Sequence, residues 1–131
     1  MKDNIILTIS SLLTIVLTIF HVTSDIALGI DKPGLAHLFI VVPIVVVLLY
    51  GTLVLAGRRS GYIIILVGSI FGLVVPYLHM SSSRIGERAA SSGGYFFIWT
   101  LLAMAVTSLF SVILSARGLW SFSHSRRAGQ S

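Results

Sequence analysis

The chain has 131 residues, of which 56% are hydrophobic and only 10% are charged, whereas a soluble domain carries about 25% charged residues. So apolar a chain cannot cover a globule with water-compatible surface, which argues against a soluble domain. The net charge of +5 arises from basic residues at segment ends, with no basic stripe interleaved with aromatics, so we expect no nucleic-acid partner. The absence of cysteine excludes disulfides, thiolate metal sites and thiol redox chemistry.

Four apolar runs follow one another along the chain, and none contains Lys, Arg, Asp or Glu: 4–24, 35–57, 61–80 and 94–116. A helix rises about 1.5 Å per residue, so a run of ~20 residues spans the ~30 Å hydrocarbon core of a bilayer. Backbone groups in lipid must be hydrogen-bonded within the segment, which favours helices. The sequence therefore predicts an all-α fold, an integral membrane four-helix bundle that forms a single transmembrane domain over residues 1–131.

The first run also has some features of a secretory signal peptide. Lys2 precedes the apolar stretch, and Val22-Thr23-Ser24 ends it, so cleavage after Ser24 is an alternative. However, the apolar part of a signal peptide is usually about 7–15 residues long and ends at a small-residue A-x-A site. This run is longer and lacks that site, and we expect it to be retained as a helix.

The connections between the runs are short. Residues 25–34 contain turn and breaker residues. Only residues 58–60 separate the second run from the third, so these two helices should form an antiparallel hairpin. Residues 81–93 are rich in small polar residues and read as a loop. The tail 121–131 has no apolar periodicity, and we expect it to be disordered.

The basic residues predict the orientation. Cytoplasmic ends of membrane helices carry an excess of Lys and Arg. Six basic residues lie on the side that holds both termini and the second connection, against three on the other side. The six are Lys2, Arg58, Arg59, Arg117, Arg126 and Arg127, and the three are Lys32, Arg84 and Arg88. We therefore expect both termini in the cytoplasm, with a bacterial plasma membrane as the location.

Small and hydroxyl residues recur at helical spacing in three of the runs. The positions concerned are Thr14 and Thr18 in the first run, Gly68 and Gly72 in the third, and Thr107 and Ser111 in the fourth. Such faces let helices approach closely, so they predict helix packing. A hydrophilic passage is the alternative, but coupled transport usually requires an ionisable residue near the membrane midplane, and these runs place none there. The second run is apolar from Leu38 to Leu49 and contains Pro43.

Four polar residues are expected near one membrane interface. His21 lies about 24 Å along its helix from Ile5, and His79 about 27 Å from Gly61, on helices that run parallel. Asp25 is one turn beyond His21, and His37 begins the second run at the same level. Interhelical hydrogen bonding explains histidines at such positions. A metal site of His21, Asp25 and His79 is the sharper hypothesis, and a haem held between the two histidines is a further one.

No motif assigns an activity. No HExxH sequence, phosphate-binding loop or nucleotide fingerprint is present. We therefore expect a non-enzymatic membrane protein, either an accessory subunit or a self-associating bundle, and an enzyme is the open alternative. A metal- or haem-binding redox protein that uses the histidines is one alternative, and a small transporter or channel is another. The expected partners are the lipid bilayer and a homo-oligomer or larger membrane complex, and no cofactor is assigned.

Overall fold

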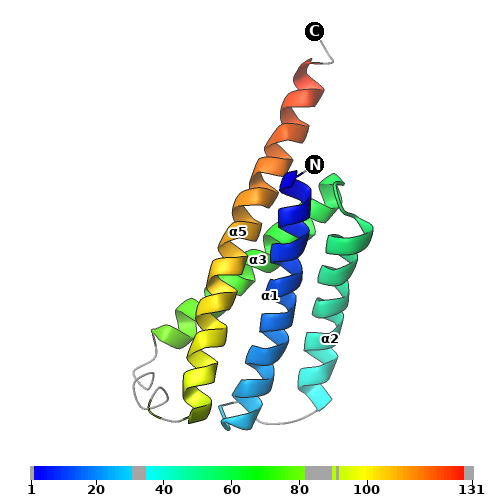
Figure 1. The fold of residues 1–131 in the computed structure, drawn as a ribbon. Coiled ribbons are helices and arrows are strands. Elements are labelled where there is room, and N and C mark those ends of the chain that lie inside the picture. Colours follow the sequence, from blue (N-terminus) through cyan, green and yellow to red (C-terminus); the bar gives the residue numbers. More distant parts are fainter. Residues whose placement is uncertain (1, 31–34, 82–89, 91, 129–131) are drawn as a thin grey trace.

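The computed structural model describes residues 2–30, 35–81, 90 and 92–128. This described part is all-α: it contains four α-helices and no strand. The helices are α1 (Lys2–Ala27), α2 (Leu35–Leu49), α3 (Arg59–Met80) and α5 (Ser92–Ala128), and a π-helical segment, η1 (Tyr50–Val54), continues α2. Both chain ends lie toward the same end of the molecule, together with the turn between η1 and α3 (Figure 1).

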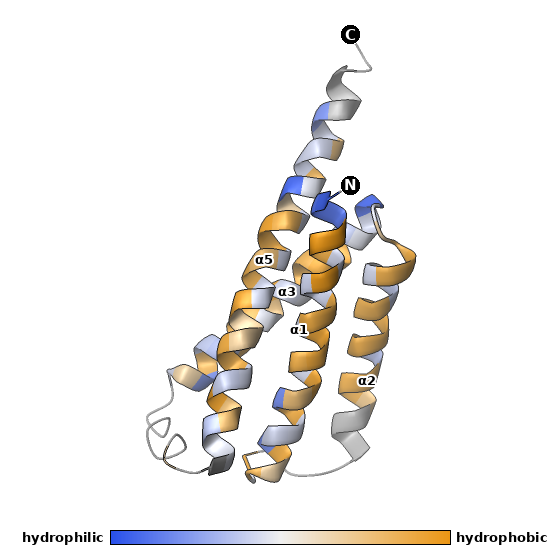
Figure 2. Ribbon diagram, in the orientation of Figure 1, coloured by the Kyte–Doolittle hydropathy of each residue, from blue (hydrophilic) through white to orange (hydrophobic). Residues whose placement is uncertain are grey.

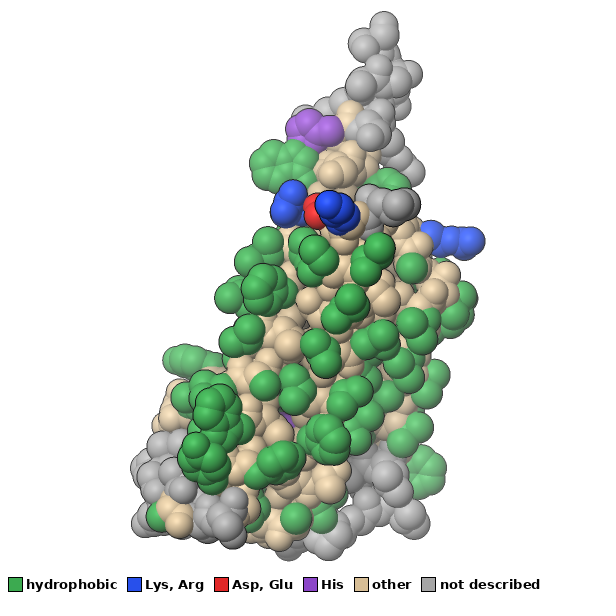
Figure 3. Space-filling view, in the orientation of Figure 1, with side chains coloured by type: hydrophobic (Ala, Val, Ile, Leu, Met, Phe, Trp, Pro, Cys, Tyr) green, Lys and Arg blue, Asp and Glu red, His purple; other side chains and the backbone are tan. Residues whose placement is uncertain are grey.

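Three of these helices, α1, α3 and α5, are long and apolar enough to cross a membrane. The apolar helical stretch Phe39–Val54 is shorter than these three. Figure 2 shows that hydrophobic residues occupy the middle of the helices and that hydrophilic residues gather toward their ends. Apolar side chains also cover the face drawn in Figure 3, and the Lys and Arg side chains of the described residues seen there lie near the end that holds the termini. By length and composition alone, these three helices suggest a membrane protein.

The centre of the molecule is built on one face of α5, which we call the α5 seam. Its members are all buried and follow one another at spacings of three and four: Phe97, Leu101, Met104, Ser108, Ser111 and Ser115. Glycines on α3 and α5 allow close approach along it, since a Cβ on Gly72 would overlap the Ser108 hydroxyl and a Cβ on Gly118 would overlap the Tyr62 ring. Small residues on the facing helices therefore bring α1, α3 and α5 together.

Helix α2 packs differently. None of its described side chains, from Phe39 to Leu49, is buried. A uniformly apolar helix gains nothing by exchanging lipid for apolar protein, so it has no strong reason to pack closely. The Leu48 side chain of α2 lies against Gly68 of α3. A hydrogen bond to α1 forms at η1, where the buried Thr52 hydroxyl lies 2.7 Å from Ser11 Oγ.

The helix boundaries differ from the predicted ones mainly at the ends. Helix α1 continues to Ala27, and Gly29 follows with a positive φ of 66°. The second helical stretch ends at Val54 rather than at residue 57, because the chain turns at Gly57, whose φ is 73°. Both φ values favour glycine. Most of the predicted loop 81–93 lies outside the described residues.

The C-terminal end also differs from the prediction. Helix α5 continues to Ala128, so residues 121–128 are helical where an irregular tail was expected. Local contacts support this extension: the Trp120 ring nitrogen donates to His124 Nε2 at 3.0 Å, and the two rings stack. The Ser121 and Ser123 hydroxyls bond to carbonyl oxygens one turn earlier. These contacts are independent of apolar periodicity, which is why that pattern missed them.

Candidate metal centre

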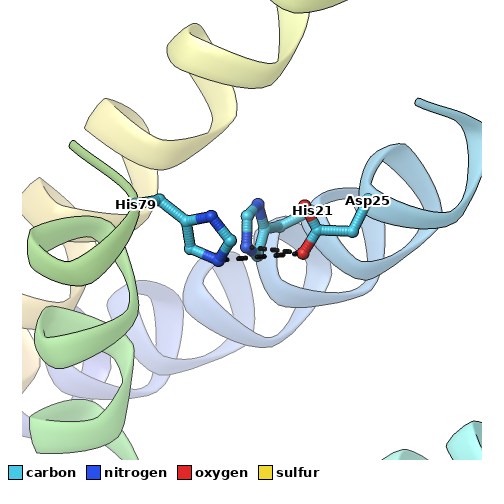
Figure 4. A group of neighbouring side chains, drawn as sticks. All are labelled: His21, Asp25 and His79. Carbon is cyan, nitrogen blue, oxygen red and sulfur yellow. Dashed lines mark ion pairs between the residues drawn. The ribbon is translucent and has the colours of Figure 1, made fainter. Parts of the chain in front are cut away.

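The structure brings His21, Asp25 and His79 together, and we call these three residues the His–Asp cluster. His21 and Asp25 lie one turn apart on α1, and His79 comes from the last turn of α3. The Asp25 Oδ2 atom is 3.2 Å from His21 Nε2 and 3.8 Å from His79 Nε2. Both imidazoles point toward the same carboxylate oxygen (Figure 4). The three residues each offer a ligand atom, and these atoms lie within 4.8 Å of one another.

The cluster is largely removed from solvent. His21 is 2% exposed and Asp25 4% exposed, while His79 is partly buried. A carboxylate in apolar surroundings is costly unless a cation, a hydrogen-bond donor or a metal ion compensates it. The two imidazoles supply such partners directly, and they supply nitrogen ligands if an ion binds. Ionisable residues buried in an apolar helix bundle are costly, so this cluster is a candidate functional site.

Phe97 on α5 forms the inner wall of the cluster. Its ring centre lies 5.1 Å from that of His21 and 5.5 Å from that of His79, and the side chain is fully buried. The two histidine rings meet edge to face, with centres 4.8 Å apart. Phe97 therefore limits how the imidazoles can rotate and keeps water from that side. No sequence motif singles out Phe97, although its helical spacing from Leu101 and Met104 is a signal that it is buried.

The geometry suits a small metal ion. In a tetrahedral site with bonds of about 2.0–2.1 Å, neighbouring ligand atoms are about 3.3 Å apart. The two nitrogen–oxygen distances, 3.2 and 3.8 Å, lie near that value, and all three ligand atoms lie within 4.8 Å of one another. A set of two His and one carboxylate leaves a fourth position open, as in zinc enzymes, and the same set also holds Fe²⁺. Small side-chain shifts would complete such a site.

The haem hypothesis does not fit this arrangement. A haem with two histidine ligands requires the flat macrocycle to lie between the two imidazoles. Here the rings of His21 and His79 contact each other, Asp25 Oδ2 lies close to both, and Phe97 packs against both. The space that a macrocycle needs is filled by the protein's own side chains.

A cavity of about 800 Å³ borders the cluster. Its walls come from α1, α2 and α3, with Met104 of α5 between them, and it exists because α2 does not close against α3. His21, Asp25 and His79 all contribute to its lining. We call it the lateral cavity.

The other residues named for packing lie along the helix contacts. Thr14 donates to Thr107 Oγ1 on α5 at 3.0 Å, and Thr18 donates to Met104 Sδ at 3.4 Å. The buried Ser111 bonds to the Thr107 carbonyl of its own helix. Ser108, which the sequence analysis did not name, is the residue that faces Gly72.

The two glycines of the third run have different neighbours. Gly72 faces Ser108 of α5 and Thr14 of α1, whereas Gly68 faces the Leu48 side chain of α2. The structure does not describe the side chain of His37. Arg84 also lies outside the described residues.

No protein-family model, curated protein or solved structure matches this chain. Its function is therefore inferred from its own geometry.

Proposed function

We propose that this is a membrane-spanning protein that binds a divalent transition metal, with Zn²⁺ the first candidate, through His21, Asp25 and His79. The observation that supports it is the meeting of three ligand atoms from two helices within 4.8 Å, with two of the residues almost fully buried. Three protein ligands hold an ion and leave one position for water or another ligand. Metal binding alone requires no catalytic residues, so this proposal is compatible with a non-enzymatic membrane protein.

We also propose that all four helices cross the bilayer as a bundle, with both termini in the cytoplasm. Helix α2 and η1 together cover residues 35–54, about the length a span requires. Basic residues support the orientation, because Lys2, Arg58, Arg59 and Arg117 are exposed near the end that holds the termini. Arg117 pairs there with Asp3 at 3.3 Å. In a bacterial plasma membrane the His–Asp cluster would then lie near the outer interface.

The lining of the lateral cavity favours binding over transport of a polar solute. Its α2 and α3 walls are mostly aliphatic, and polar atoms for a hydrated ion to follow are concentrated at the cluster. A pathway for a hydrophilic solute needs polar groups along its length. The bilayer is the partner that this proposal requires; self-association or a larger complex would add to it.

The metal proposal is tested on protein purified in a neutral detergent, stripped with a chelator and titrated with Zn²⁺. We expect one ion per chain by elemental analysis. His21→Ala and His79→Ala should each weaken binding by at least about 100-fold, since losing a ligand exceeds the effect of losing an outer-shell partner. His124→Ala is the matched control, because this exposed histidine pairs with Trp120 far along α5. If the folded His21→Ala/His79→Ala double variant binds Zn²⁺ as the wild type does, the site is wrong.

The orientation is tested by labelling single cysteines in intact cells, since the chain has no native cysteine. A cysteine that replaces Ser131 should be protected from a membrane-impermeant reagent, and one that replaces Ala90 should react. Ala90 is exposed and precedes α5 at the opposite end of the molecule from the termini. Labelling of the Ser131→Cys variant from outside would reverse the proposed topology.

A further inference from the structure

The lateral cavity is long and narrow rather than round. Its lining on α3 extends from Ile63 to His79, a distance of about 24 Å at the helical rise. Its volume of about 800 Å³ lies within the range of small-molecule sites, about 300–1,000 Å³. The cavity therefore has the size of a ligand site and the length of an extended chain.

Polarity is concentrated at one end of the lateral cavity. The His–Asp cluster occupies that end, and the α2 wall opposite α3 is formed by Pro43, Ile44, Val47 and Leu48. Thr14 and Thr18 also line the cavity, but each hydroxyl already lies within hydrogen-bonding distance of a carbonyl of its own helix and of a side chain on α5. The cavity is thus an aliphatic trough that ends at nitrogen and oxygen ligands.

The trough is open toward the side of the molecule. Ile44 and Val47 on α2 and Val67 on α3 line the cavity, yet each is about half exposed. A chain can therefore enter between α2 and α3 from the bilayer and lie against both helices. Entry from the aqueous phase is not required.

Resting on the proposed metal site, we infer that the lateral cavity binds a long-chain carboxylate, with the unbranched chain between α2 and α3 and a carboxylate oxygen at the open metal position. A divalent ion held by one carboxylate and two neutral imidazoles keeps a net positive charge, which attracts an anionic head. The aliphatic walls suit a saturated chain. Together these two features select an amphiphile of this class over a polar solute.

The experiment uses the full chain in a neutral detergent, loaded with Co²⁺ as a coloured substitute for Zn²⁺. Hexadecanoate is added, and the visible spectrum of Co²⁺ reports whether a new ligand enters its coordination sphere. Acetate serves as the probe that has the same head without the chain. Val47→Trp and Val67→Trp fill the trough from its two walls. Val106→Trp is the matched control, because Val106 is similarly exposed on α5 and does not line the cavity.

We expect hexadecanoate to change the Co²⁺ spectrum at a concentration at least tenfold below that of acetate. This advantage should be lost in at least one trough variant and kept in Val106→Trp, with Co²⁺ affinity unchanged in all three. Equal potency of the two carboxylates, or a full advantage in both trough variants, would overturn the inference and leave the metal site standing. Absence of Co²⁺ binding to the wild type would overturn both proposals.

Discussion

Helix α3 has two neighbours that it contacts in different ways, α5 on one side and α2 on the other. Toward α5 it presents Gly72, which meets the small Ser108 of the α5 seam. Toward α2 it presents Gly68 and a row of Val and Ile side chains, and these meet branched apolar residues. The first contact is close, and the second leaves the lateral cavity.

The difference shows what holds helices together in lipid. Apolar side chains gain little by leaving lipid for one another, so association depends on close backbone approach and on interhelical hydrogen bonds. Helices α1, α3 and α5 have both, whereas the described part of α2 from Phe39 to Leu49 has bulky apolar side chains only. The lateral cavity therefore lies where close packing is weakest, and the buried His–Asp cluster borders it.

Among the changes that distinguish the α3–α5 contact from the α3–α2 contact, Gly72→Leu should have the largest effect on stability. The added side chain would collide with Ser108 and Thr14 on two different helices, and overpacking of this kind costs about 3 kcal/mol. Gly68→Leu is the matched change, and it should cost less than about 1 kcal/mol, because Leu48 lies on a helix that can yield. The free energy of unfolding in detergent and the oligomeric state are measured for both variants. Equal losses of unfolding free energy in the two variants would mean that α2 packs against α3 as firmly as α5 does.

A metal ion should stabilise the side of the molecule that holds the His–Asp cluster, because it joins α1 to α3. At a Zn²⁺ concentration 100-fold above its dissociation constant, a ligand that binds only the folded state adds about 2.7 kcal/mol. Melting curves with and without Zn²⁺ should show this gain in the wild type and in His124→Ala. They should show none in His79→Ala. A gain that survives in His79→Ala would exclude this residue as a ligand.

A smaller effect is expected from the hydrogen bond that crosses the α5 seam. Thr14 and Thr107 are joined by their hydroxyls at 3.0 Å. Substituting each by Val, singly and together, should give a coupling energy of about 0.6 kcal/mol, the average for such pairs in membrane helices. Thr23→Val paired with Thr107→Val is the control, because the Thr23 hydroxyl bonds only within its own helix, and its effect should be additive. Additivity for the Thr14–Thr107 pair would contradict the contact.

The smallest effect is expected on the α2 side itself. Val47→Trp places a large side chain at the open trough and should change the free energy of unfolding by less than about 0.5 kcal/mol. Leu101→Trp, the corresponding change in the fully buried α5 seam, should cost about 1–3 kcal/mol or more. Thermal unfolding of the two variants gives the comparison. A similar loss in both would show that the trough is closed in the folded protein.

Much of this architecture follows from local properties that a sequence carries. The apolar runs predict the helices, since length and composition alone decide which segments suit a bilayer. The spacing of four between His21 and Asp25 places them on one helix face, and the helical rise places His79 at the same depth. These quantities depend on one helix at a time. The helix ends were less well predicted, because Gly29, Gly57 and the Trp120–His124 contact act over a few residues only.

The tertiary structure decided which faces meet. It set Phe97 against both imidazoles, removed the space for a haem, and turned Gly68 and Gly72 toward different helices. It also left α2 and α3 incompletely packed against each other, and the lateral cavity lies between them beside the His–Asp cluster. No single run contains this information. In lipid, two helices associate through the fit of small residues on both surfaces, and that fit exists only once the helices are placed together.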